Sequence, residues 1–359
     1  MTLILTNADI ERLVTMPECI DIIEDGFREL GRGEASGRPR SLNYSPLRPG
    51  EPDDYYALTT CDAALPSRGI HILRITSDRM AIRRADGRER RTKLAAGPGG
   101  TYCGLIMLFS TETLEPLAIL QDALLNRWMV GATSAIAARA LANPSPRRMA
   151  LIGAGWLAPT QALGHCAILP LQRIDVYSPT RAHSERLVAE IQPQVGAELV
   201  VVDDPRAAIE AADIVAVATN STKPVFDGDW LRAGQHVGSV QVMELDDRTH
   251  ERASVIVARA AEAISYWHPE TFRPAEVDQF RRWQPAWDAK LRLLGKVLVG
   301  AQQGRASADD ITLFGGSGTG PSAGVGIQWA PAIVALERAR ERGIGVEVPS
   351  ELFVEEFHP

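Results

Sequence analysis

The run Arg148-Met-Ala-Leu-Ile-Gly-Ala-Gly-Trp-Leu-Ala158 is the most informative part of this sequence. It is an apolar segment of strand type that breaks at Gly153 and Gly155 and then continues with helix-forming residues. In a dinucleotide-binding turn, the first glycine permits a sharp bend, and the second lets a pyrophosphate approach bare backbone at a helix N-terminus. Because glycine pairs also occur in ordinary turns, the surrounding sequence has to distinguish the two interpretations.

Strands and helices alternate regularly after Met149. The pattern predicts strands over 149–153, 173–177, 198–202, 213–218, 236–240 and 254–257, and helices over 157–168, 182–193 and 205–212. Such alternation is typical of a parallel sheet that is covered by helices on both faces. We therefore predict an α/β protein with a Rossmann-type doubly wound domain, in which the cofactor contacts Gly153, Gly155, Trp156 and Leu157.

The residues that follow the second and fourth of these strands bear on the cofactor. An NAD-binding domain usually carries a carboxylate at the tip of the second strand, but here the tip carries Ser178, Thr180 and Arg181. Two hydroxyls and an arginine favour NADP, and NAD remains the alternative because Asp175 would serve if the strand ended earlier. The fourth strand leads into residues expected on the nicotinamide side, or in a simple polar turn: Thr219, Asn220 and Ser221.

Composition narrows the class of protein. The 359 residues suit about two domains, and 45% hydrophobic with 23% charged residues is ordinary for a globular protein. A formal charge of −7 argues against a nucleic-acid binder. The four cysteines form no CxxC pair, so we expect reduced thiols, no metal site and a cytoplasmic protein. Since no apolar stretch reaches about 18 residues, we expect neither secretion nor membrane insertion.

The flanking segments have a different character. Before the alternating region we predict two short helices, several strands and an alanine-rich helix over 123–142, which ends at a Pro-rich candidate hinge over 143–146. The basic segment 79–93 contains an Asp-Gly turn, which favours a solvated hairpin or loop over a phosphate or partner site. After the alternating region, aromatic residues gather between 266 and 287 as a satellite core, a pocket cap or a subunit contact. Helices over 287–303 and 325–342 follow.

Several blocks of the sequence occur in an order that is shared with a known family. They are Pro39-Arg40, Leu73-Arg-Ile-Thr-Ser77, Gly104-Leu-Ile-Met-Leu-Phe109, Thr113-Leu-Glu-Pro-Leu-Ala118, Gly131-Ala-Thr-Ser-Ala-Ile-Ala-Ala-Arg139, the Gly153 turn, Trp230-Leu-Arg-Ala-Gly-Gln-His-Val237 and Asp310-Ile-Thr-Leu-Phe314. In this order the blocks resemble the ornithine cyclodeaminase and mu-crystallin family. The resemblance covers nearly the whole chain and implies a Rossmann domain, residues 132–315, inserted in an α+β substrate-binding and dimerisation domain of residues 1–131 and 316–359. It also implies a homodimer that binds NAD or NADP and acts on a small amino or imino acid.

The resemblance also implies roles for individual residues. Arg40 falls where the family keeps an arginine that binds the substrate carboxylate, a role suited to the bidentate guanidinium. Arg74 stands where the family keeps its active-site lysine, and a second family arginine matches Met129, with Arg127 as a candidate to compensate. In the cyclodeaminases an aspartate follows the strand that matches 236–240. The nearest carboxylate here is Glu244.

Two more groups complete the candidate site. His71 and Asp78 flank Arg74 in sequence and are candidates for proton transfer, although a core imidazole and a surface turn are the bland interpretations. Thr133, in the alanine-rich helix, is a further candidate to contact the cofactor.

The missing lysine and aspartate decide between reactions. Cyclodeamination needs acid–base groups at several steps, whereas an iminium carbon accepts hydride directly once its carboxylate is held. We therefore predict NADP-linked reduction of an imino acid (a ketimine), with Arg40 and Arg74 on the carboxylate. The alternatives are an amino-acid cyclodeaminase or dehydrogenase, and a non-catalytic NADPH-dependent binding protein.

Overall fold

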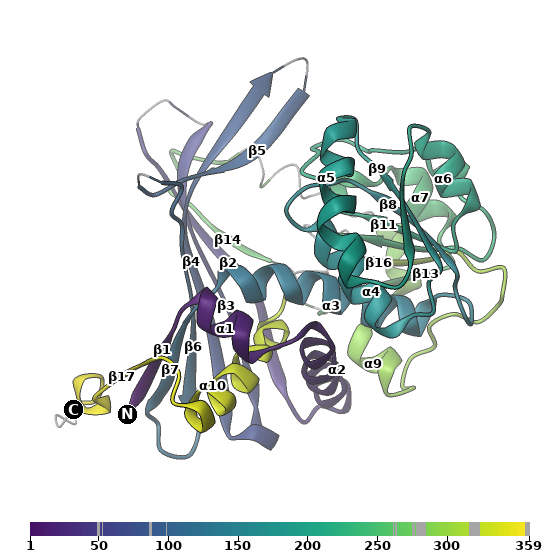
Figure 1. The fold of residues 1–359 in the computed structure, drawn as a ribbon. Coiled ribbons are helices and arrows are strands. Elements are labelled where there is room, and N and C mark those ends of the chain that lie inside the picture. Colours follow the sequence, from purple (N-terminus) through teal and green to yellow (C-terminus); the bar gives the residue numbers. More distant parts are fainter. Residues whose placement is uncertain are drawn as a thin grey trace.

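The computed structural model describes residues 1–48, 51, 53–85, 88–97, 99–260, 262, 264–274, 277, 285–315 and 324–355. These residues form two β-sheets, and helix α3 (Ala123–Leu141) lies between them (Figure 1). No helix in the described part of the chain combines the length and apolarity needed to span a membrane.

The first sheet is built from both ends of the chain. Its neighbours run in the order β14-β2-β3-β4-β6-β7-β1-β17, and β5 pairs with β4 beyond this path. β1 is parallel to β7 and antiparallel to β17, which brings the two chain ends to one edge (Figure 1). The strands are β1 (Thr2–Leu5), β2 (Ser36–Pro46), β3 (Asp54–Leu65), β4 (Ile70–Ala85), β5 (Arg88–Leu94), β6 (Cys103–Ser110), β7 (Pro116–Gln121), β14 (Ser265–Trp267) and β17 (Val346–Val348).

The basic segment forms a hairpin, which was one of the two predicted interpretations. β4 continues past the body of the sheet and pairs with β5 (Figure 1). Its arginines bind carboxylates on the neighbouring β3 side: Arg79 Nε lies 2.9 Å from Asp54 Oδ1, and Arg84 Nη1 lies 2.5 Å from Asp53 Oδ2. These ion pairs neutralise part of the positive charge of the hairpin.

Helices cover one face of the first sheet. α1 (Asn7–Leu13) and α2 (Met16–Arg32) begin at threonines. Thr6 forms a reciprocal capping box with Asp9, and Glu18 accepts from the Thr15 backbone N–H. They pack with α3 and α10 (Pro331–Arg342) on a core that includes Ile72 and Leu108 of the sheet. The predicted final helix is therefore confirmed only from Pro331, since Gly326–Trp329 is a 3-10 turn.

The second sheet confirms the predicted Rossmann-type domain. All its strands are parallel, in the order β10-β9-β8-β11-β12-β16-β13-β15, so the strand order reverses between β8 and β11. Alternate residues of β8 enter the cores on opposite faces, as in a doubly covered sheet. The strands are β8 (Arg148–Ile152), β9 (Arg173–Tyr177), β10 (Glu198–Val201), β11 (Ile214–Val217), β12 (His236–Ser239), β13 (Val255–Ala258), β15 (Leu291–Leu293) and β16 (Thr312–Gly315).

The helices between these strands start and stop within two residues of the predicted positions. They are α4 (Ala158–Ile168), α5 (Arg181–Ile191) and α6 (Pro205–Ala211), with α7 (Asp247–Arg252) and α9 (Leu294–Leu298) later in the chain. The predicted helix over 287–303 is wrong. Leu291–Leu293 pairs with β13 as a parallel strand, and only the short helix α9 follows it. A short apolar run is compatible with a helix or a strand, and here pairing with β13 makes it a strand.

α3 connects the two sheets through an unusually close helix contact. A Cβ on Gly131 of α3 would lie 2.0 Å from the Thr160 carbonyl oxygen, and one on Gly164 of α4 would lie 2.7 Å from the Gly131 carbonyl oxygen. Only glycine allows the two backbones to approach this closely. The strand β14 also crosses between the parts, because Ser265 pairs with Ser41 of β2. The domain boundaries at 131/132 and 315/316 stay a prediction.

Two histidines are fully buried near this contact, His165 on α4 and His236 on β12. Burial lowers the pKa of His165 to about 4 and, with the charge of His165 adding to it, the pKa of His236 to about 3. In the unfolded chain both would titrate near pH 6.5. The unfolded state therefore binds protons first, and stability is lost as the pH falls below about 6.5.

We predict that His236→Gln makes the protein less sensitive to acid. Between about pH 7 and about pH 5, the wild-type free energy of unfolding should fall by about 2 kcal/mol more than that of the variant, because only the histidine gains a proton on unfolding. Urea unfolding at both pH values measures this. His183→Gln, at an exposed position, is the control and should match wild type. An identical pH dependence in His236→Gln would contradict the assignment.

Candidate active site at the domain interface

The Gly153 turn has the geometry of a dinucleotide cradle. Gly153 has φ of 110°, in the region that favours glycine, and a Cβ there would lie 2.3 Å from the Ala218 carbonyl oxygen. A Cβ on Gly155 would meet no atom within 4 Å, so this backbone faces open space that a phosphate can enter. Trp156 is exposed, and Leu157 precedes the first turn of α4.

The carboxyl ends of β11 and β12 are joined through Glu244. This carboxylate is fully buried and accepts hydrogen bonds from the Thr219 backbone N–H, the Gln241 backbone N–H at 2.8 Å and Ser239 Oγ at 2.9 Å. Burial raises the pKa of Glu244, and the donors oppose that rise. Glu244 therefore holds the loop that carries Thr219. Asn220 is exposed on that loop, and Ser221 Oγ donates to the Lys223 carbonyl oxygen.

The tip of β9 carries the side chains predicted there. Asp175 lies inside the strand, fully buried, where its carboxylate binds Arg148 at 2.6 Å and Arg173 at 2.8 Å. The Asp175 carboxylate is therefore occupied by arginines at the amino ends of β8 and β9. It does not reach the carboxyl end of β9, after which Ser178 and Thr180 lie. The alternative that Asp175 binds a ribose hydroxyl is not supported by this placement.

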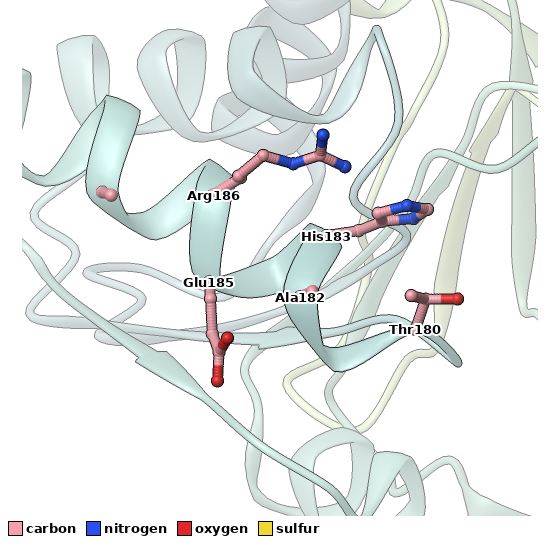
Figure 2. Close-up of a pocket in the computed structure, with 6 residues that line it drawn as sticks. Thr180, Ala182, His183, Glu185 and Arg186 are labelled. Carbon is pink, nitrogen blue, oxygen red and sulfur yellow. The ribbon is translucent and has the colours of Figure 1, made fainter.

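Arg181 opens α5 and is held by two carboxylates. Its Nη1 lies 2.6 Å from Asp203 Oδ1, and its Nε lies 2.9 Å from Glu185 Oε1. A hollow of about 560 Å³ lies beside this end of the helix. Figure 2 shows His183 and Arg186 extending to one side of the helix and Glu185 to another. The lining residues are Thr180, Ala182, His183, Glu185, Arg186 and Ala189.

Arg40 is aimed by an irregularity of β2. The pairing of β2 with β3 shifts register between Arg38 and Ser41, and Pro39 instead bridges to Val325. Proline lacks a backbone N–H for the ladder, and such bulges re-aim the side chains that follow. The Arg40 guanidinium carbon lies 6.0 Å from the ring centre of Trp329.

Arg74 reaches the same indole from β4. Its guanidinium carbon lies 4.9 Å from the ring centre of Trp329, and its Nη2 lies 2.7 Å from Asp122 Oδ2. The other carboxylate oxygen of Asp122 accepts from Trp329 Nε1 at 2.8 Å. All three side chains are almost fully buried. Burial alone would lower the pKa of Arg74, but Asp122 more than offsets this and holds the pKa above its usual value.

The two proton-transfer candidates lie apart from this group. Burial alternates along β4, with Arg74 and Asp78 on the buried face and His71 on the other. His71 Nε2 lies 3.4 Å from Asp62 Oδ2. Asp78 lies about 13 Å along the strand from Arg74 and binds Lys93 Nζ at 2.8 Å. The structure thus brings Arg40 and Arg74 together but not His71.

The two candidates on α3, Arg127 and Thr133, and the neighbouring Met129 all make contacts within the protein. Met129 is buried in the core, and Arg127 turns toward the other domain, where its Nε lies 2.8 Å from the Trp156 carbonyl oxygen. Thr133 is fully buried; its hydroxyl donates to the Met129 carbonyl oxygen and accepts from Gln328 Nε2 at 2.9 Å. Arg127 thereby supports the glycine turn, and Thr133 joins α3 to the C-terminal segment.

Asp122 and Trp329 were missed in the sequence. Asp122 directly precedes a long helix, which is a signal for a cap, but its side chain makes no cap bond and turns to Arg74 instead. Trp329 lies 207 residues away from Asp122, so no local pattern could have paired them.

Comparison with known proteins agrees with this fold. The family model described as the ornithine cyclodeaminase/mu-crystallin family matches residues 1–323. A Delta(1)-pyrroline-2-carboxylate reductase of Bacillus cereus is 28% identical over 256 residues, 69% of this chain and 74% of its own. An uncharacterized cyclodeaminase of Sinorhizobium fredii is 27% identical over 350 residues, 95% of this chain and 97% of its own. The solved Thermococcus litoralis Delta(1)-pyrroline-2-carboxylate reductase, in complex with NADH and L-proline, has a TM-score of 0.76 at 24% identity and covers 97% of this chain and 100% of its own.

We predict that Asp122→Asn destabilises the protein by about 3 kcal/mol or more, because the buried Arg74 charge loses its partner and faces an amide N–H. The amide oxygen can still accept from Trp329. In the double variant Arg74→Met/Asp122→Asn no charge is left without its partner, so most of the loss should be recovered. Urea unfolding measures all three free energies.

The control is Glu210→Gln, which removes an exposed ion pair with Arg206 and should leave the stability unchanged. A double variant that is no more stable than Asp122→Asn would show that the loss comes from something other than the unpaired guanidinium.

Proposed function

The chain belongs to the ornithine cyclodeaminase/mu-crystallin family, and on that premise we propose that it is an NAD(P)H-dependent oxidoreductase that reduces an imino acid to an amino acid. The observation that carries the proposal is the pair of guanidiniums, Arg40 and Arg74, over one buried indole. This pair suits a carboxylate, and it contains no group that readily exchanges a proton.

The two arginines have different parts in holding the carboxylate. The Arg74 bonds to Asp122 use Nε and Nη2, so a substrate carboxylate would be received at Nη1. Arg40 approaches from β2, which is separated from β4 by β3, and supplies a second fork. Since Arg74 is locked by Asp122 and Trp329, its position needs no reorganisation when the substrate binds.

The residues of the glycine turn fit a dinucleotide. The cradle at Gly155 is open, Gly153 supplies the bend, and the N-terminus of α4 follows. When bound, the reduced nicotinamide supplies the hydride. Glu244 fixes the loop at Thr219, and thereby the wall of the site at the carboxyl ends of β11 and β12.

The placement of acidic and basic groups favours reduction over cyclodeamination. Glu244 is committed to three loop donors, and His71 lies on the far face of β4. A substrate that arrives as the protonated imine already carries the proton of the product amine, so it requires no acid from the protein. Cyclodeamination would need such a group at several steps.

Three assays with the purified protein distinguish the candidate functions. NADH or NADPH with a cyclic ketimine such as Delta(1)-pyrroline-2-carboxylate tests reduction by loss of the reduced-nicotinamide absorbance. NAD or NADP with amino acids tests dehydrogenation, and ornithine or lysine with ammonia detection tests cyclodeamination. Tight cofactor binding without turnover in any assay would favour the binding protein. A cytoplasmic homodimer also belongs to this proposal, and sedimentation tests the dimer.

We predict that Arg40→Gln raises the KM for the imino acid by about 100-fold while kcat falls much less, because the lost fork binds the carboxylate in ground state and transition state alike. Arg38→Gln is the matched control, since Arg38 is exposed two residues earlier and pairs with Asp62. Steady-state kinetics measure both. An unchanged KM for Arg40→Gln would place the carboxylate elsewhere.

The preference between NADH and NADPH depends on Asp203 in this proposal. The sequence favours NADP through Arg181, but a 2′-phosphate must compete with the Asp203 carboxylate for that guanidinium. We therefore predict that Asp203→Asn raises the ratio of kcat/KM for NADPH over NADH by about tenfold. Glu198→Gln, at the other end of β10, is the control. A constant ratio would mean that Arg181 does not contact the 2′-phosphate.

A further inference from the structure

Arg259 follows directly after β13, at the carboxyl end of the second sheet. Its side chain is 7% exposed, and its guanidinium carbon lies 4.6 Å from the ring centre of Phe314 on the adjacent β16. Val255, Val257 and Arg259 alternate along the chain, and the first two belong to the core shared with Trp329 and the first sheet. Arg259 therefore points from the nucleotide-binding domain toward the substrate-binding side.

The backbone brings Arg259 close to Arg40. Six residues after Arg259, Ser265 pairs with Ser41, the neighbour of Arg40, and six residues span at most about 20 Å. Each of these arginines lies beside a glycine at or after the end of β16. A Cβ on Gly315 would lie 3.5 Å from Arg259 Nη1, and a Cβ on Gly324 would lie 3.1 Å from Arg40 Nε. Burial lowers the pKa of Arg259 to about 10, and the positive charge of Arg40 contributes. Arg259 thus lies near enough to Arg40 for their charges to repel each other, although Arg40 belongs to β2 and Arg259 follows β13.

The site is therefore richer in guanidinium than one carboxylate requires. Arg40 and Arg74 both lie beside Trp329, and together they form the proposed clamp for the carboxylate next to the imine carbon. Arg259 approaches from the opposite domain, at the edge of the parallel sheet where ligands bind. An anionic group on the other end of a short substrate would be attracted by both Arg259 and Arg40.

Resting on the proposed function, we propose that Arg259 binds a second carboxylate of the substrate, so that the enzyme acts on the imino forms of short 2-oxo dicarboxylic acids. Reduction adds hydride from the reduced nicotinamide to the imine carbon. The imine carbon–nitrogen double bond becomes single, and the nitrogen carries the proton that the iminium brought. The products are an amino dicarboxylic acid and the oxidised cofactor.

The experiment compares two four-carbon imines formed in solution with ammonium, one from oxaloacetate and one from 2-oxobutanoate. Wild type should show a kcat/KM at least about tenfold higher for the dicarboxylic imine. Arg259→Gln should lower that value by about 100-fold and change the monocarboxylic value by less than about threefold. Arg259→Lys should restore part of the loss, because it returns the charge without the fork.

A binding measurement separates this inference from the proposed function. With NADH present, calorimetry should show tighter binding of succinate than of butyrate to wild type, and Arg259→Gln should remove the difference. If wild type reduces neither imine but the succinate preference holds, the reductase proposal fails and the role of Arg259 stands.

Two results would overturn the role of Arg259: a wild type that prefers the monocarboxylic ligands, or an Arg259→Gln variant that affects both ligands equally. Circular dichroism and NADH binding check that each variant is folded. If Arg259→Gln does not fold, the wild-type comparison and the Arg259→Lys variant still test the role of Arg259. An Arg259→Lys variant whose dicarboxylic preference and rates equal those of wild type would contradict a role for the arginine fork.

Discussion

The site depends on the hydrogen bonds of the Asp122 carboxylate. It lies at the start of α3, binds Arg74 with one oxygen and accepts from Trp329 with the other, and thereby joins β4 to the C-terminal segment. A buried guanidinium without this partner would be costly, whereas with it the charge is tolerated and fixed. The same helix continues to Gly131, where it meets α4 of the other domain. One helix therefore fixes both Arg74, the proposed substrate-binding arginine, and the position of the dinucleotide domain.

The division of labour between the two domains follows from their sheets. The mixed first sheet can direct single side chains into a shared core, and its bulge at Pro39 turns Arg40 toward Trp329. The parallel second sheet is buried on both faces, so its chemistry is confined to the carboxyl ends of its strands. Gly153, Thr219 and Arg259 all follow such ends. The space between these ends and Trp329 is where cofactor and substrate would meet.

The alternating half of the chain could be predicted because its signals are local. Each strand and helix there is a short periodic segment bounded by turn residues, and the Gly153 turn requires only its own backbone conformation. Contacts over long distances in sequence could not be predicted in this way. β16 inserts between β12 and β13, β14 joins the first sheet, and Leu291–Leu293 becomes a strand only because β13 is beside it. The candidate site shows the same limit, since Arg40 and Arg74 could be found by family resemblance but Asp122, Trp329 and Arg259 could not.

Position 74 carries an arginine where the family resemblance implies a lysine, and the partners around it suit that arginine. A lysine ammonium would be a compact charge that can lose its proton, whereas arginine brings a planar fork that stays charged. The fork needs a carboxylate and an aromatic face to be buried stably, and Asp122 and Trp329 supply both. Once these partners are in place, position 74 can orient an anion but cannot serve as an acid or a base. The proton of the product must then come with the substrate, which makes an iminium a better fit than an amino acid awaiting oxidation.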